Sequence, residues 1–308
     1  MAPRSADCTG AVSSPRDIPR LSAVVITWNE REELARCLEA LAAHSAEGGQ
    51  EVIVVDNAST DGSDAVLARH PEVRVIRNAE NRGVTVARNQ GLAQARGRYV
   101  AMLDSDAYVG PGALERLCAH LDDNPDVGMV GPELRYEDGS LQMSCRRVPS
   151  PLAVVANRLP GVAWLHEGRA RRRYLMLDEP HERTMDVEYL LGATMVFARD
   201  AAERIGRFDE RFGFSTPGGY GFDDADWAVR MRRAGRRVVY LPAAKVVHGY
   251  RRRLAKQPVS RQSAGLAVSY LMLRLKHLGA LGRAASSEGL AVVAGAGRPA
   301  FKVALQHD

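Results

Sequence analysis

Short apolar runs alternate with segments of helical periodicity through the first half of the chain. The runs at 21–27, 51–56 and 98–103 are rich in β-branched residues and predict buried strands. Between them, apolar side chains recur three or four positions apart, as at Leu34 and Leu38, and this spacing predicts helices. Strands that are joined by helical crossovers indicate an α/β protein with a largely parallel sheet, covered on both faces.

The same pattern predicts further elements along the chain. Helices are expected over 64–70, 84–95, 113–124 and 223–235, and strands over 73–78, 127–134, 236–242 and 244–250. After about Leu141 the alternation breaks into an irregular segment with Pro, Gly and clustered Arg. An amphipathic helix is expected over 266–278, near the C-terminus.

These patterns suggest a single folded domain with two extensions. Residues 1–19 are polar and lack the apolar core of a signal peptide, so we expect a disordered lead-in. The domain itself is expected over 20–250. Residues 251–308 are expected to form the C-terminal helix and a loose tail.

Polar side chains stand where three predicted strands end. Asn29, Asp56 and Asp104 each follow an apolar run, and α/β proteins bind ligands at the carboxyl ends of their strands. Asn29 also predicts a helix N-cap, with Glu32 at the spacing of a capping box. The three strand ends are therefore candidates for one shared site.

Composition and charge narrow the class of protein. The four cysteines are far apart and form no CxxC pair, which excludes a zinc ribbon and suits a reducing compartment. The longest apolar stretch near the C-terminus meets Arg274 before it could span a bilayer, so we expect a soluble protein. From Met231 to Asp308 the chain carries 15 Lys or Arg and 2 Asp or Glu. This basic third could face nucleic acid, an anionic membrane or a phosphate-bearing substrate, or could simply be a solvated surface.

Two acidic clusters carry candidate chemistry. In YVAMLDSDAYVGP, Asp104 and Asp106 stand one residue apart, where a hard divalent cation would relieve their repulsion. An Asp-rich turn explains the same residues, and D-x-D alone does not decide between the two. In FDDADW, Asp223, Asp224 and Asp226 begin a predicted helix, where acids gain about 0.3–1 kcal/mol from the helix dipole. Three acids exceed what capping needs.

Taken together, the motifs resemble the family 2 glycosyltransferases, which are inverting enzymes with a GT-A fold. The resemblance covers roughly Leu21 to Tyr250, through TWNE, VIVVDNASTDGS, ENRGVTVARNQGLAQARGRYVAMLDSDA, LLGATMVF and FDERF…FDDADWAVRMRRAGRRVVYLPAAKVVH. Rhamnosyltransferase-like members look most similar. The resemblance implies a single Rossmann-like, nucleotide-sugar-binding domain with a mixed, mostly parallel sheet and a C-terminal helical extension.

The resemblance also implies roles for the residues on the nucleotide side. Asp56 would accept a hydrogen bond from the ring N–H of the base. Thr27, Asn29 and Glu30 would line the base and ribose pocket. Arg88 is the candidate for the diphosphate, with a surface arginine as the alternative.

Further roles concern the cation and the acceptor. Asp104 would reach the ribose or the metal, and Ser105 would belong to the nucleotide-sugar site. Asp106 and His248 would be ligands of Mn²⁺ or Mg²⁺. Asp224 would be the general base that deprotonates the acceptor hydroxyl. Asp223 stands where the family usually has Glu. The Gly-rich loop 213–222 is longer than in rhamnosyl enzymes and is a candidate acceptor lid.

The implied function is metal-dependent, inverting transfer of a sugar from a dTDP- or UDP-sugar to a glycan or polyprenyl-diphosphate-linked acceptor. A soluble natural-product acceptor and an inactive glycan-binding relative stay open as alternatives. A dinucleotide-dependent oxidoreductase is excluded because TWNEREEL stands where GxGxxG would be needed. We expect no nucleic-acid partner, and a cytoplasmic enzyme that is either free or peripheral on the inner face of the membrane. An anionic membrane surface and a homodimer contact are both open uses of the C-terminal helix.

Overall fold

The computed structural model describes residues 18–150, 168–213, 221–249 and 259–277. The predicted lead-in, much of the irregular segment, most of the Gly-rich loop and the tail therefore lie outside the described residues. The predicted boundaries at 20–250 and 251–308 stay predictions.

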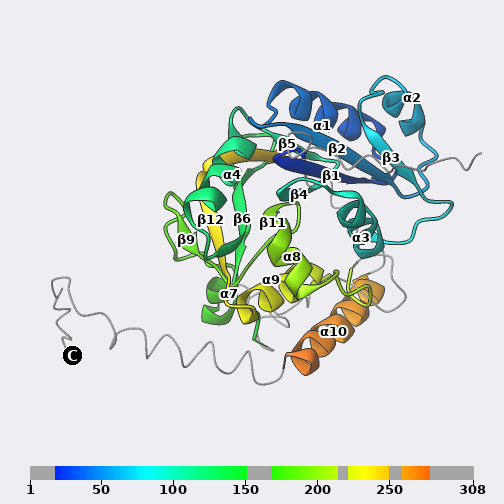
Figure 1. Ribbon diagram of the computed structural model, residues 1–308. Helices are drawn as coiled ribbons and strands as arrows, with labels where there is room; N and C mark the ends of the chain where they lie inside the picture. The colour runs from blue at the N-terminus through cyan, green and yellow to red at the C-terminus, as the bar shows by residue number, and fades with distance from the viewer. Residues whose placement is uncertain (1–17, 151–167, 214–220, 250–258, 278–308) are drawn as a thin grey trace, which may run out of the picture.

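The described chain alternates strands and helices through its first half, as predicted (Figure 1). The strands are β1 (Leu21–Thr27), β2 (Gln50–Asp56), β3 (Arg74–Arg77), β4 (Tyr99–Asp104), β5 (Ala107–Val109), β6 (Val127–Arg135), β7 (Leu141–Gln142), β8 (Cys145–Arg146), β9 (Met185–Asp186), β10 (Tyr189–Leu190), β11 (Thr194–Ala198) and β12 (Arg237–His248). The helices are α1 (Arg31–Ala43), α2 (Ser63–Leu67), α3 (Val84–Gln94), α4 (Ala113–Asp123), α7 (Arg169–Tyr174), α8 (Arg199–Ile205), α9 (Asp223–Arg233) and α10 (Val259–Lys276).

One large sheet organises the molecule. Its strand order is β3-β2-β1-β4-β11-β6-β12-β5, with β7 beside β6 and β9 beside β12. Strands β3, β2, β1 and β4 are parallel, and so are β6 and β12, whereas β11 and β5 pair antiparallel with their neighbours. This confirms the mixed, mostly parallel sheet of the expected α/β class.

Helices cover both faces of this sheet (Figure 1). Side chains along β1 alternate between the two faces, since Ala23 and Val25 enter one apolar cluster and Val24 and Ile26 enter the other. The first cluster also takes in α1, α2 and α4, and the second takes in α3, α8, α9 and α10. A strand that is covered on both faces needs apolar residues at successive positions, and the run in β1 provides them.

The predicted capping box at the start of α1 is wrong. The helix begins at Arg31, and Glu30 takes the N-cap position without a capping hydrogen bond from its side chain. The backbone N–H of Arg31 instead donates to Asp61 in the β2–α2 loop, at 2.7 Å. Asn29 has a left-handed backbone with φ of 51°. Its Oδ1 instead accepts a hydrogen bond from the backbone N–H of Thr60, at 2.6 Å. Asn29 therefore ties the β1–α1 turn to the β2–α2 loop, a long-range contact that local pattern does not reveal.

Two other local predictions also differ from the structure. The separate strands expected over 236–242 and 244–250 form the single strand β12, which shifts register between Leu241 and Lys245. Pro242 lies within that shift and has no backbone N–H to donate, which accounts for the interrupted pairing. The C-terminal helix begins at Val259, seven residues before the predicted start at 266.

Candidate functional site

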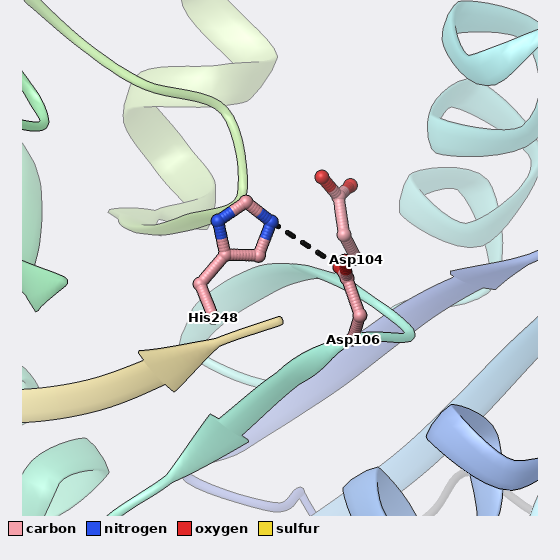
Figure 2. A group of neighbouring side chains, drawn as sticks. All are labelled: Asp104, Asp106 and His248. Carbon is pink, nitrogen blue, oxygen red and sulfur yellow. Dashed lines mark ion pairs between the residues drawn. The ribbon is translucent and has the colours of Figure 1, made fainter. Parts of the chain in front are cut away.

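Three side chains from two distant parts of the chain meet at the carboxyl edge of the sheet. Asp104 ends β4 and Asp106 follows in the next turn, while His248 ends β12. Because β12 pairs antiparallel with β5, His248 lies opposite Ala107 and next to the DSD turn. Figure 2 shows the His248 ring pointing toward Asp106, with Nε2 3.2 Å from Oδ1, and Asp104 beside them. One ligand atom from each of the three lies within 4.8 Å of the others.

A residue that sequence reasoning missed fixes the imidazole. Gln142, in β7, is buried, and its Oε1 lies 2.8 Å from Nδ1 of His248. Both ring nitrogens therefore face oxygen acceptors. Burial disfavours the charged ring, but the hydrogen bond and charge of Asp106 outweigh it and raise the pKa of His248. With Nδ1–H held by Gln142, Nε2 is the nitrogen directed at the carboxylates.

The donor set of this cluster fits a divalent cation. Burial raises the pKa of Asp104 and the charge of Asp106 raises it further, although Arg88 and His248 act in the opposite direction. Two carboxylates that disfavour each other's charge gain from a cation placed between them. Carboxylate oxygens suit both Mg²⁺ and Mn²⁺, and an imidazole nitrogen is better suited to Mn²⁺. Asp104, Asp106 and His248 could therefore hold either ion.

Arg88 joins this cluster to the second acidic motif. The arginine is buried in α3, and its guanidinium lies 3.5 Å from Oδ1 of Asp104 and forms a closer ion pair with Asp223. It also donates to the backbone oxygen of Gly192, at 2.8 Å. A buried arginine with these partners is not a solvated surface residue. Its predicted role at the diphosphate stays a prediction.

The three acids at the start of α9 differ in their partners. Asp223 pairs with Arg88, and the fully buried Asp226 contacts Arg230, Lys276 and His277 at 2.7–2.9 Å. Among the residues that the structure describes, Asp224 forms no ion pair. Its hydrogen bonds with described residues come from backbone N–H groups, those of Gly192 at 3.2 Å and of Ala225 at 2.8 Å.

Environment makes Asp224 the acid best suited to accept a proton near neutral pH. Burial raises its pKa most and the neighbouring charge of Asp223 raises it further, to about 7, although Arg88 pulls in the other direction. Phe222, which precedes this pair, has a left-handed backbone with φ of 65°, a conformation that costs energy for a side chain of its size. Such local strain is common where a side chain must be aimed.

Gly192, in the motif LLGATMVF, is a second residue that sequence reasoning missed. Its backbone N–H donates to Asp224 and its carbonyl accepts from Arg88, so the backbone of this one residue orients both side chains. A Cβ added at this glycine would lie 2.9 Å from a guanidinium nitrogen of Arg88. The arginine is held by its other partners and could not easily withdraw. The glycine within the motif LLGATMVF was the feature of the sequence that could have indicated this close backbone contact.

The remaining candidates lie along the same edge, on β1, β2 and the turns that follow. Thr27 and Asp56 are paired across β1 and β2, and both are buried. Oδ1 of Asp56 accepts from the N–H of Ser59, at 3.0 Å, whereas the buried Oγ1 of Thr27 has no hydrogen-bond partner among the described residues. A buried hydroxyl without a partner is uncommon and is compatible with a ligand contact.

Glu30 connects this nucleotide side to the DSD turn. Its carboxylate accepts a short hydrogen bond from the hydroxyl of Ser105, which is fully buried between the two aspartates. The structure thus brings all the predicted site residues to one edge, while the role of each stays a prediction.

Comparison with known proteins adds independent findings. A family model described as "Glycosyl transferase family 2" matches residues 22–205. The chain is 30% identical to N-acetylglucosaminyl-diphospho-decaprenol L-rhamnosyltransferase of Mycobacterium tuberculosis (strain ATCC 25618 / H37Rv), over 84% of this chain and 85% of that protein.

Solved structures with the same architecture include two that hold Mn²⁺. A mannosyltransferase, PcManGT from Pyrobaculum calidifontis in complex with GDP-Man and Mn²⁺, matches 90% of this chain and 76% of its own, with 25% identity and a TM-score of 0.52. GalNAc-T7 with UDP, GalNAc and Mn²⁺ matches 75% of this chain and 44% of its own, with 15% identity and a TM-score of 0.55. The fold is the GT-A fold that the sequence motifs imply.

Proposed function

Because the chain belongs to glycosyl transferase family 2 and is a glycosyltransferase, we propose that it transfers a sugar with inversion from a nucleotide diphosphate donor to a polyprenyl-diphosphate-linked glycan. The observation that supports this proposal is the meeting of two sets of groups at one sheet edge. Asp104, Asp106 and His248 form a cation-binding cluster, and Arg88 bridges it to the helix that begins with Asp223 and Asp224.

On the donor side, the nucleotide would lie along the ends of β1 and β2. Asp56 would accept a hydrogen bond from the ring N–H of uracil or thymine, with Thr27 and Asn29 lining the base and ribose pocket. Glu30 and Ser105, which bond to each other, would hold the ribose end close to the DSD turn. A dTDP- or UDP-sugar fits a carboxylate that accepts from a pyrimidine N–H.

The diphosphate would lie beside the cation-binding cluster and Arg88. Asp104, Asp106 and His248 would hold Mn²⁺ or Mg²⁺, and a bound cation stabilises the charge that develops on the leaving diphosphate. Arg88 would supply a second positive charge next to the cluster. Its ion pairs with Asp104 and Asp223 fix its place before a substrate arrives.

Asp224 would act as the general base of the transfer. The acceptor hydroxyl loses its proton to the Asp224 carboxylate as its oxygen bonds to the anomeric carbon, and the nucleotide diphosphate leaves with the electrons of the broken bond. Attack on the face opposite the leaving group inverts the anomeric centre. A carboxylate suffices because the transition state has oxocarbenium character. The hydrogen bond from the backbone N–H of Gly192 would keep the Asp224 carboxylate in position.

The acceptor class rests on the mycobacterial relative, which by its name acts on a decaprenol-linked sugar and aligns with most of this chain. The alternative of a soluble natural-product acceptor stays open. The alternative of an inactive glycan-binding protein is disfavoured because both acidic clusters are retained and converge.

A binding panel followed by a transfer assay tests this proposal. The melting temperature would be measured with UDP, dTDP and GDP, each with and without Mn²⁺, because a ligand at a hundred times its Kd adds about 2.7 kcal/mol of stability. We expect a Mn²⁺-dependent shift with dTDP or UDP. Transfer from dTDP-rhamnose and UDP-hexoses to a polyprenyl-diphosphate-linked N-acetylglucosamine would then identify the donor. Absence of any nucleotide-dependent shift would contradict the proposal.

A further inference from the structure

The C-terminal helix α10 is fixed to the helix that carries the acidic motif. Leu266 and Leu273 are buried in the same apolar cluster as α9. At the end of α10, Lys276 and His277 contact the buried carboxylate of Asp226, at 2.7 Å and 2.8 Å. Apolar packing and the contacts to Asp226 therefore both fix α10 against α9.

The opposite side of α10 is also apolar. Val268, Leu271 and Leu275 are 47%, 57% and 58% exposed, and their spacing places them on one face of the helix. We call these three residues the outer face of α10. Ile18 and Trp28 are the other large exposed apolar side chains of the described chain, so this kind of exposure is concentrated on one helix. A helix that is apolar on both sides needs a second apolar surface to cover it.

The basic residues on and before α10 favour an anionic lipid surface as the partner that covers the outer face. Arg274 lies on α10 beside the outer face, and the sequence just before the helix, RRRLAK (251–256), adds four basic residues. An apolar helix face with basic residues nearby is typical of helices that lie in the headgroup layer of anionic bilayers. A second copy fits less well. Three side chains offer far less area than the roughly 800 Å² that each partner buries in a stable interface. The basic C-terminal thirds of two copies would also repel each other.

We propose that the outer face of α10 inserts into the headgroup layer of an anionic bilayer. The inference rests on the proposed function, since a polyprenyl-linked acceptor is itself held in a membrane. The ring of Tyr270 on α10 lies 6.1 Å from the ring of Phe222, the residue before Asp223. Docking through α10 therefore brings the acid cluster of α9 close to the lipid surface. Within the described residues no helix is long and apolar enough to cross a bilayer, so the contact is peripheral.

Vesicle flotation of the full chain tests the proposal. The vesicles would consist of phosphatidylcholine alone or of an equal mixture of phosphatidylcholine and phosphatidylglycerol. We expect binding to the mixed vesicles that weakens as salt is raised, and little binding to phosphatidylcholine alone. Leu271→Glu and Leu275→Glu, made singly, should each weaken binding about tenfold, because each removes an inserted apolar side chain and adds a repelled charge.

Ile18→Glu is the matched control, since it changes an equally exposed apolar side chain outside α10 in the same way. It should bind vesicles like the unchanged protein. Equal loss in the control, or no binding of the full chain to anionic vesicles, would overturn the proposal. So would a dimer, seen by light scattering, that Leu275→Glu dissociates.

The surface and the proposed function can fail separately. Nucleotide-dependent melting shifts report on the donor site alone, and all three variants should keep them. Vesicle binding without sugar transfer would reject the function and keep the surface. Transfer to a short-chain, water-soluble acceptor without vesicle binding would keep the function and reject the surface.

Discussion

The strand edge at Asp104, Asp106 and His248 and the start of α9 both gather carboxylates, but they handle the charge differently. At the strand edge, Asp106 contacts the imidazole of His248, and one ligand atom from each of Asp104, Asp106 and His248 lies within 4.8 Å of the others. At the start of α9, the acids diverge to separate partners. A convergent set suits an ion held in common, whereas a divergent set leaves each acid with its own chemistry.

The contrast within α9 singles out one acid. Asp223 and Asp226 each have cationic partners. Burial disfavours the charge of Asp226, but its hydrogen bonds and ion pairs outweigh burial and lower its pKa. Asp224 is held by backbone N–H groups and is desolvated, so its pKa rises. Adjacent residues of the same type thus separate into two that hold the structure and one suited to exchange a proton.

Replacing the acid that lacks an ion pair tests this contrast most strongly. Asp224→Asn should reduce transfer by about 10²–10⁴-fold, because the amide cannot accept the proton. Its single oxygen can keep only one of the two backbone hydrogen bonds that Asp224 accepts. Nucleotide binding should be unchanged. The melting temperature at pH 8 should stay equal or rise, since a buried charge is removed. Rates from an initial-velocity assay would check this, and full turnover would reassign the base.

Replacing the paired acid should give the opposite result. Asp226→Asn leaves Lys276, His277 and Arg230 without their carboxylate, and breaking such a buried pair costs roughly 3 kcal/mol. Denaturant unfolding would measure the loss. Transfer per folded molecule should be kept at low temperature. If this variant is stable but inactive, the division of roles within α9 is wrong.

At the strand edge, the residue to replace is Gln142, which contacts Nδ1 of His248. Gln142→Leu removes the acceptor of the His248 Nδ1–H bond and should weaken Mn²⁺ binding by about 10–100-fold. Gln142→Glu keeps an acceptor oxygen there and should lie closer to the unchanged protein. Titration of Mn²⁺, followed by the electron paramagnetic resonance signal of the free ion, gives both affinities without an activity assay. Equal affinities for all three proteins would remove Gln142 from the site.

The smallest expected effect is a pH dependence that comes from α9 alone. Asp224 accepts a proton only when ionised, and its pKa is raised from the usual 3.8 to about 7. The transfer rate should therefore fall about tenfold per pH unit below 7 and level off above it. An aspartate with an ordinary pKa would give a flat profile between pH 6 and pH 8. Such a profile, with the cation kept saturating, would contradict the environment described for Asp224.

The parts of the fold that periodicity controls were predictable from sequence. Strand ends at Thr27, Asp56 and Asp104 lie where the apolar runs stop, because a parallel sheet buries whole runs and exposes their ends. The sequence motifs also indicated the family. Sequence alone could not establish that His248 reaches Asp106, since that contact depends on pairing between β12 and β5.

What was missed depends on contacts between distant segments. Gln142 lies in the region where the pattern breaks, and only the pairing of β7 with β6 brings it to the imidazole. Asn29 matched a local capping box, yet its oxygen bonds to Thr60 in another loop. Local rules fail at these positions because a tertiary partner competes for the same polar group.

The ion pair between Arg88 and Asp223 limits how such enzymes can be recombined. Arg88 belongs to the half of the chain that precedes the DSD motif, and Asp223 to the half that follows it. A chimaera that takes its second half from a homologue with a different residue at that position would leave the buried guanidinium of Arg88 without its closer ion-pair partner, with only the longer contact to Asp104 remaining. If acceptor specificity is exchanged by swapping halves, positions 88 and 223 must therefore be taken from the same parent protein.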